Sequence, residues 1–209
     1  MIFLWNWFVK ITAWPVQKVI LRTKVICEDR AVQGRHIRGP AILVSNHNAV
    51  FDYAVLLFTF FTRTLRVQMA ELLFRKPVLN VFLRMLGGIE VNRDAHDLTS
   101  LSRCVTILKR GGVVGIFPES RLPLPGEERP LPFHEGAAEL ALSTGVPVIP
   151  VHISGRYFTK TRMRIVIGTP VDLRAVCGGI TDEREARRTA TAYLRDRVTE
   201  LGSYVNRET

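Results

Sequence analysis

The sequence predicts an α/β fold: one domain with a mixed, largely buried β-sheet flanked by helices, preceded by an N-terminal amphipathic helix or helical pair. Two observations predict it. Short apolar runs alternate with longer helix-like segments along most of the chain. A chain of 209 residues with 47% hydrophobic content can bury one substantial core but is short for two. We therefore expect a helical segment over residues 1–22 and one domain over 23–209.

The N-terminal segment is rich in Trp, Phe, Ile and Val, including Trp5, Trp7 and Trp14. Polar residues, among them Lys10 and Lys18, interrupt it before the roughly 20 apolar residues that a membrane-spanning helix needs. It also lacks the basic start, unbroken apolar run and cleavage site of a secretory signal. We expect an amphipathic helix in the headgroup layer, with Lys side chains reaching anionic lipid. The alternative is a helix that only caps the core.

After this segment, strand-like and helix-like blocks alternate in the order expected of an α/β sandwich. Residues rich in Val, Ile and Leu predict strands, and longer amphipathic stretches predict helices. The loops that follow the strands are the natural places for functional side chains. The expected strands are 25–27, 41–44, 67–69, 89–91, 113–117, 148–153 and 163–167, and the expected helices are 53–61, 78–86, 98–109, 135–142 and 183–204.

The net charge of +10 and a pI near 10.2 indicate an anionic partner. The basic residues are scattered among apolar ones, without zinc-finger spacing or an aromatic RNA-binding strand, which disfavours nucleic acid. Anionic lipid and a phosphorylated substrate remain, as does a merely solvated basic surface. Cys27, Cys104 and Cys177 are far apart and form no C-x-x-C pair, so we expect neither disulfides nor a metal site, in a reducing, cytoplasmic setting.

The first motif with chemical content is Asn46-His47 followed at H-x-x-x-x-D spacing by Asp52, between a strand and an apolar helix. The two side chains can meet only if His47 lies in the turn and Asp52 in the first helical turn. A carboxylate on one imidazole nitrogen fixes the tautomer and stabilises the imidazolium that forms when a hydroxyl loses its proton. His134 and Glu139 have the same spacing, but we place them on one continuous helix, where they cannot meet, and interpret His134 as structural.

Three further blocks follow strand-like segments. One is a glycine turn that leads through a short strand to Arg93, whose guanidinium could bind phosphate. The next is a buried strand that ends at Pro118 and continues into a charged loop. The last is an apolar strand with two prolines. Taken alone, each block is a turn or strand end of a kind that is common in α/β proteins. The residues of interest in the last two are Glu119, Ser120, Arg121, Val146, Pro147 and Pro150.

Together and in this order, the four motifs resemble the glycerolipid acyltransferase family that includes the 1-acyl-glycerol-3-phosphate acyltransferases. That family shows N-H-x4-D, G-x5-R, F-P-E-G-T-R and V-P-x-x-P-V, and the resemblance runs from about residue 23 to 168. It implies acyl transfer from acyl-CoA or acyl carrier protein, without another cofactor, to a lysophospholipid at the cytoplasmic face of a membrane, where the protein would be peripheral or monotopic. Residues 23–209 would then be the acyltransferase domain.

The resemblance also implies residue roles. His47 would be the general base and Asp52 its orienting partner. Arg93 would bind the acceptor's phosphate. The remaining implied roles are substrate binding for Asn46, Glu119, Ser120 and Arg121, and the acyl-chain region for Val146, Pro147 and Pro150.

Two departures from the family pattern fall in the acceptor-binding part. The third motif is one residue short and has Ser120 in place of glycine, and the second has Asn92 where aspartate is usual. They leave open 1-acyl-glycerol-3-phosphate or another acceptor, such as lysophosphatidylethanolamine. From other classes, a thioesterase or serine hydrolase is disfavoured by the missing G-x-S-x-G elbow, and a non-catalytic lipid-binding protein remains the other alternative.

Overall fold

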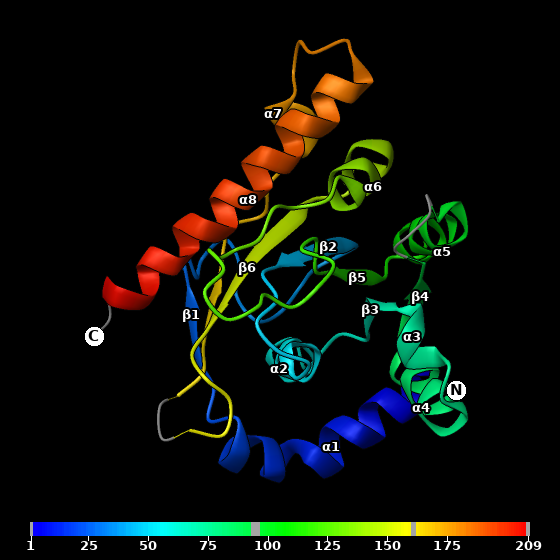
Figure 1. The fold of residues 1–209 in the computed structure, drawn as a ribbon, viewed down its shortest axis with the longest axis vertical. Coiled ribbons are helices and arrows are strands. Elements are labelled where there is room, and N and C mark those ends of the chain that lie inside the picture. Colours follow the sequence, from blue (N-terminus) through cyan, green and yellow to red (C-terminus); the bar gives the residue numbers. More distant parts are fainter. Residues whose placement is uncertain (1, 93–96, 160–161, 208–209) are drawn as a thin grey trace.

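A computed structural model describes residues 2–92, 97–159 and 162–207 (Figure 1). Within them, one seven-stranded sheet runs through the molecule in the order β1-β7-β6-β2-β5-β3-β4. The pairings are parallel except for β6 with β7, which is antiparallel, so the expected mixed sheet is confirmed. The strands are β1 (Lys24–Cys27), β2 (Ala41–Ser45), β3 (Leu65–Ala70), β4 (Ile89–Val91), β5 (Val113–Ile116), β6 (Val148–Ser154) and β7 (Arg164–Ile167).

Helices cover both faces of the sheet. Helices α5 (Leu98–Lys109), α6 (Gly136–Thr144) and α8 (Glu183–Arg207) pack on one face, with α7 (Leu173–Val176) against α6. The other face carries α1 (Ile2–Ile20), α2 (Asp52–Thr59), α3 (Glu71–Phe74) and α4 (Pro77–Leu86). Helices α3 and α7 were not predicted, because four residues are too few to show a helical period.

The central strand β2 explains why the sheet is buried on both faces. Its five residues are all buried, and successive side chains point to opposite faces. Leu43 joins the core beneath α2, whereas Ile42 and Val44 join the core beneath α5, α6 and α8. A strand with two apolar faces is typical of a parallel sheet covered by helices.

Helix α1 is one continuous helix that includes Pro15, and it turns two of its polar residues, Asn6 and Lys10, toward the protein. Lys10 is fully buried, and its Nζ donates to the backbone oxygens of Phe61 at 2.9 Å and Arg63 at 2.6 Å. Asn6 is also buried and donates to the Leu86 oxygen at 3.0 Å. The prediction that Lys10 reaches lipid is therefore wrong: its ammonium group caps the chain that follows α2.

The opposite side of α1 is apolar and exposed to solvent. Phe3, Leu4, Phe8 and Ile11 each expose more than half of their surface. Among the described residues, no helix is both long and apolar enough to cross a membrane. Helix α1 thus presents an apolar face outward while it is anchored inward by polar contacts.

Candidate active site

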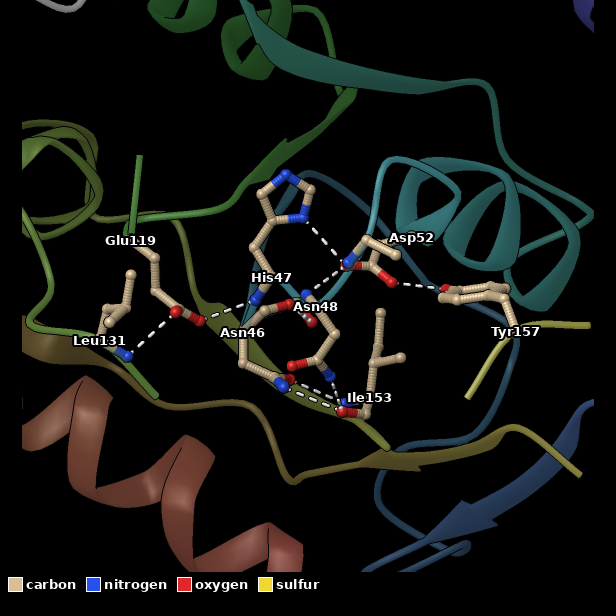
Figure 2. A network of polar contacts seen from close by, with 10 residues as sticks. Asn46, His47, Asn48, Asp52, Glu119, Leu131, Ile153 and Tyr157 are labelled. Carbon is tan, nitrogen blue, oxygen red and sulfur yellow. Dashed lines mark hydrogen bonds and ion pairs between the residues drawn. The ribbon is translucent and has the colours of Figure 1, made fainter. Parts of the chain in front are cut away.

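The imidazole of His47 contacts Asp52 as the spacing predicted. His47 lies in the turn after β2, and Asp52 is the first residue of α2. Its Nδ1 is 2.9 Å from Oδ2 of Asp52, and Figure 2 shows the other ring nitrogen directed away from the labelled network. Because a carboxylate accepts hydrogen bonds, Nδ1 is the donor in this contact, and in the neutral imidazole Nε2 then has a free lone pair. The side chain of His47 is 16% exposed, so Nε2 can serve as a base at the surface of the fold.

The carboxylate of Asp52 is completely buried and receives four donors. Oδ2 accepts from the backbone amides of Asn48 at 2.6 Å and Ala49 at 2.9 Å, as well as from His47. Oδ1 accepts from the hydroxyl of Tyr157, which follows β6. A buried carboxylate without such donors would be strongly destabilising. The Asp52 side chain is thereby fixed in position.

Two asparagines tie the His47 turn to the end of β6. The amide of Asn46 both accepts from the Ile153 amide at 2.7 Å and donates to the Ile153 oxygen at 2.8 Å. Asn48 donates to the same oxygen at 2.6 Å (Figure 2). Asn46 is buried, and both ends of its side-chain amide contact backbone. The structure therefore places Asn46 as a brace for the turn, and its contact with a substrate stays a prediction.

Glu119 braces the turn from the other side. Its Oε1 accepts from the His47 amide at 2.7 Å, and its Oε2 accepts from the Leu131 amide at 2.9 Å (Figure 2). Burial raises the pKa of this carboxyl group, while the two backbone donors lower it. Glu119 bonds to the backbone of the base, and both of its oxygens face backbone amides, so acceptor binding stays a prediction for it.

A cavity of about 630 Å³ lies next to Phe117, and His47 itself is not among its lining residues. The ring of Phe117 stacks on His47 with centroids 4.4 Å apart, and Phe117 also lines this cavity. The base and the cavity thus share an aromatic wall. His134 and Glu139 line the same cavity, but α6 begins at Gly136, so the prediction that one continuous helix carries both was wrong.

Ser120 and Arg121 follow Glu119 in the loop after β5. Ser120 lines the cavity and has φ +58°, in the left-handed region that favours glycine, which is the residue at this place in the family's pattern. Arg121 is exposed and forms two hydrogen bonds of 2.7 Å with Glu127. That pairing lowers the pKa of Glu127 to about 2 and raises the pKa of Arg121. Arg121 would have to leave Glu127 before it could bind an acceptor.

Three of the predicted residues that the structure describes do not lie near His47. Val146 and Pro147 precede β6, at the edge of the sheet opposite to the His47 turn, since β2 and β6 are parallel. Pro150 is buried within β6 beside Val44. An acyl-chain role for these three stays a prediction without geometric support. Arg93 lies outside the described residues.

Sequence reasoning missed Tyr157 and the stacking of Phe117 on His47. Phe117 could have been suspected, because it lies in the same motif as Glu119, at the end of a predicted buried strand. Tyr157 carries no motif, and only the pairing of β6 with β2 brings it to Asp52. Burial and the neighbouring Asp52 carboxylate both raise the pKa of its phenol, which keeps it a hydrogen-bond donor. Within the described ranges, no three His, Cys, Asp or Glu side chains gather as a metal site requires.

Comparison with known proteins places this geometry in a family. A family model described as Acyltransferase matches residues 22–154, which include the His47 turn, Glu119 and β6. Curated relatives include a chloroplastic 1-acyl-sn-glycerol-3-phosphate acyltransferase of Brassica napus, 32% identical over 56% of this chain and 33% of its own length. Another is a 1-acyl-sn-glycerol-3-phosphate acyltransferase of Borreliella burgdorferi, 29% identical over 59% of this chain and 50% of its own length.

A solved structure resembles nearly the whole chain. The crystal structure of the 1-acyl-sn-glycerophosphate acyltransferase PlsC from Thermotoga maritima aligns with a TM-score of 0.64 and 26% identity. The alignment covers 94% of this chain and 78% of that one. The chain matches only a third to a half of the Brassica and Borreliella proteins, so the similarity to them is confined to part of their length.

Proposed function

The chain belongs to the acyltransferase family, and on that premise we propose that it acylates the free glycerol hydroxyl of 1-acyl-glycerol-3-phosphate, producing phosphatidate. The acyl donor would be a thioester, acyl-CoA or acyl carrier protein, with no further cofactor. One observation carries the proposal: His47 is held through Nδ1 by a buried Asp52, which leaves Nε2 to accept a proton at the carboxyl edge of the sheet. The names of the Brassica, Borreliella and Thermotoga relatives support this acceptor.

The proposed reaction needs one base and a well-placed thioester. Nε2 of His47 takes the proton of the acceptor hydroxyl, whose oxygen forms a bond to the thioester carbonyl carbon. The tetrahedral adduct collapses, the carbon–sulfur bond breaks, and the departing thiolate takes the proton from the imidazolium. Asp52 accepts the Nδ1 hydrogen throughout, which stabilises the cationic ring. General-base assistance contributes roughly 10²- to 10⁴-fold, and positioning must supply the rest.

The test is to incubate the purified chain with labelled acyl-CoA and a panel of lysophospholipids, and to identify the product by mass. We expect labelled phosphatidate, and a loss of at least about 10²-fold in His47→Ala. His36→Ala is the matched control, because His36 is an exposed histidine that contacts Thr62 outside the site. Acyl-CoA hydrolysis without an acylated product, or full activity in His47→Ala, would refute the proposal.

A second acceptor is favoured by the charges of the cavity beside Phe117. Among its described lining residues are the carboxylates of Asp97, Glu135 and Glu139, and neither lysine nor arginine is among them. Carboxylates attract a cationic headgroup, so lysophosphatidylethanolamine is the runner-up acceptor, and the same panel decides between the two. A product with an ethanolamine headgroup would replace phosphatidate as the assignment.

We also propose that the protein works on the cytoplasmic face of a membrane, as a peripheral or monotopic protein. The apolar outer face of α1 supports this, since such a face is otherwise exposed to water. Helix α4, which packs against α1, exposes Val78, Val81 and Phe82 as well. Three free cysteines are compatible with a reducing compartment.

A further inference from the structure

A second cavity, of about 400 Å³, lies where the end of α1, the start of β1, the end of α2 and the segment before β7 meet. It is far from neutral. Its lining includes four basic side chains from separate parts of the chain, and no carboxylate is among the lining residues. It shares no lining residue with the cavity beside Phe117, so the two cavities are distinct. The basic residues are Lys18, Arg22, Arg35 and Arg162.

These four cations differ from the five arginines that form ion pairs elsewhere in the described chain. Arg75, Arg84, Arg121, Arg187 and Arg197 each contact at least one carboxylate. Over the described part of the chain, by contrast, no Asp or Glu lies within ion-pair distance of the four cavity residues. Four like charges around one cavity repel one another, and an anion in the cavity would relieve that repulsion.

Part of the cavity wall is already rigid. Arg35 donates through Nε to the Thr59 oxygen and through Nη2 to the Phe58 oxygen, both at 3.0 Å, so its guanidinium is fixed at the end of α2. Lys18 lies with its Nζ 4.0 Å from the centre of the Trp14 ring. The Oγ1 of Thr23, which also lines the cavity, is buried and has no hydrogen-bond partner among the described residues.

The helix ends at this place do not cancel the positive charge. Both α1 and α2 direct their carboxyl ends here, and each end is equivalent to roughly half a negative charge. Lys18 and Arg35 offset those two ends. Arg22 and Arg162 remain in excess, and Arg22 has φ +43°, an uncommon conformation outside glycine that holds its side chain at the cavity.

We infer that this cavity binds the phosphate of an anionic phospholipid headgroup, at a site separate from the acceptor. The inference rests on the proposed membrane contact of α1. Two sources of phosphate are chemically possible, the membrane lipid and the nucleotide end of coenzyme A. The lipid is favoured because the same end of α1 exposes Trp14 and Val19, an aromatic and an apolar side chain suited to the interface. A bound lipid phosphate would hold the carboxyl end of α1 at the membrane, in addition to the contact made by the apolar face of the helix.

The test compares two double variants that each remove two positive charges. Arg22→Gln/Arg162→Gln removes two of the four positive charges that line the cavity. Arg184→Gln/Arg188→Gln removes two exposed charges from α8, on the far side of the sheet from α1. Binding to vesicles of phosphatidylcholine, with and without 30% phosphatidylglycerol, is measured by flotation. One basic residue near an anionic surface changes binding roughly fivefold, so the cavity variant should lose about 30-fold on the anionic vesicles only. The α8 variant should bind like wild type.

Two further measurements separate a built site from its alternatives. Monomeric dihexanoyl-phosphatidylglycerol, below its micelle concentration, should bind wild type with saturable 1:1 stoichiometry and the cavity variant weakly. Equal loss in both double variants, or no saturable binding of the short lipid, means a diffuse basic surface and overturns the inference. If coenzyme A displaces the short lipid, and the cavity variant raises the KM for acyl-CoA with vesicle binding unchanged, the ligand is the donor and the lipid assignment is wrong.

The controls also keep this inference separate from the function it rests on. If wild type does not bind phosphatidylcholine vesicles at all, the membrane proposal fails. If it binds them but gains nothing from phosphatidylglycerol, only the headgroup site fails. Turnover that depends on His47 tests neither of these two points and is measured independently in the same variants.

Discussion

Asp52 shows how single side chains make the base competent. A carboxylate with no exposure to water needs hydrogen-bond donors that replace its lost hydration, and four donors do so here. Two of them are backbone amides of the turn itself. The third is His47, and the fourth is the hydroxyl of Tyr157, from a part of the chain far away in sequence. Tyr157 therefore acts as a positioning residue for the pair.

Removing that hydroxyl tests the positioning role. In Tyr157→Phe we expect kcat to fall about tenfold, because a hydrogen bond to a charged group is worth roughly 1.5–3 kcal/mol, while the KM for acceptor stays within about twofold. Steady-state kinetics with both substrates measures this. Tyr193→Phe on α8 is the control, since the Tyr193 hydroxyl makes no hydrogen bond to any described residue. An unchanged kcat in Tyr157→Phe would leave Tyr157 a packing residue only.

Ser120 is strained, and its strain can be released. A non-glycine residue in the left-handed region destabilises the folded state by roughly 1–2 kcal/mol. Glycine avoids this cost, but its greater freedom in the unfolded chain destabilises the folded state by about 0.5–1 kcal/mol. Ser120→Gly should therefore raise the free energy of unfolding by about 0.5 kcal/mol, measured by urea unfolding. Ser120→Ala keeps the strain and should not stabilise. A destabilised glycine variant would mean that the Ser120 hydroxyl stabilises the fold by more than the release of backbone strain does.

At the scale of elements, the site is a junction of three strand ends. The turn after β2 is bonded to the end of β6 through Asn46 and to the loop after β5 through Glu119. Because β2 is parallel to both neighbours, these three carboxyl ends lie at one edge of the sheet, where ligand sites of α/β folds form. The helix that begins at Asp52 then runs under α1, so α1 and the base are parts of one packed layer.

Lys10 makes the attachment of α1 dependent on pH. Burial lowers its pKa from the ordinary 10.5 to about 8. Below pH 8 the folded and unfolded states both bind the proton, and the penalty for burying the charge acts in full. As pH rises from 8 to 10.5 the folded state loses the proton first, so this penalty is progressively relieved.

The measurement is urea unfolding of wild type and Lys10→Met between pH 7 and 10. Subtracting the free energy of unfolding of the variant from that of wild type removes the contribution of all groups whose titration the substitution does not change. We expect the stability of wild type relative to the variant to be constant below pH 8 and to rise above it. A difference that is flat across the whole range would show that Lys10 titrates at its ordinary pKa despite its burial.

At the scale of the whole molecule, charge and apolar surface are distributed for a lipid interface. Helix α1 exposes Leu4 and Phe8 while Asn6 and Lys10 point inward, the reverse of a helix that packs on a core in water. Burying one such apolar side chain contributes roughly 1.5–3 kcal/mol. Leu4→Ser/Phe8→Ser should therefore weaken binding to phosphatidylcholine vesicles on the order of a hundredfold, measured by flotation.

Both substituted residues are exposed, so the variant should unfold at the same urea concentration as wild type. Val32→Ser/Leu124→Ser is the matched control, because these two apolar side chains are similarly exposed but lie in loops and not on α1. Equal losses in the two double variants would contradict a membrane-facing α1.

The sequence predicted all seven strands of the sheet and the contact between His47 and Asp52. It could do so because alternating apolar blocks and the spacing of a turn and a helix start are local properties of the chain. It did not predict the inward direction of Lys10, because composition shows that a helix is amphipathic without showing which face meets the protein. It did not predict the brace of Asn46 or the contact of Tyr157, since both depend on which strands become neighbours.

Local patterns in the chain were enough to predict the α/β class, the motif that holds the base and its carboxylate, and the family whose pattern the chain repeats. Only the tertiary structure decided which residues surround that pair, which cations gather around the cavity at the end of α1, and which face of α1 is free. The physical reason is the sequence distance over which each kind of interaction acts. Periodicity and spacing act over a few residues, whereas burial, hydrogen-bond partners and like-charge clusters arise from segments that meet only when the sheet assembles.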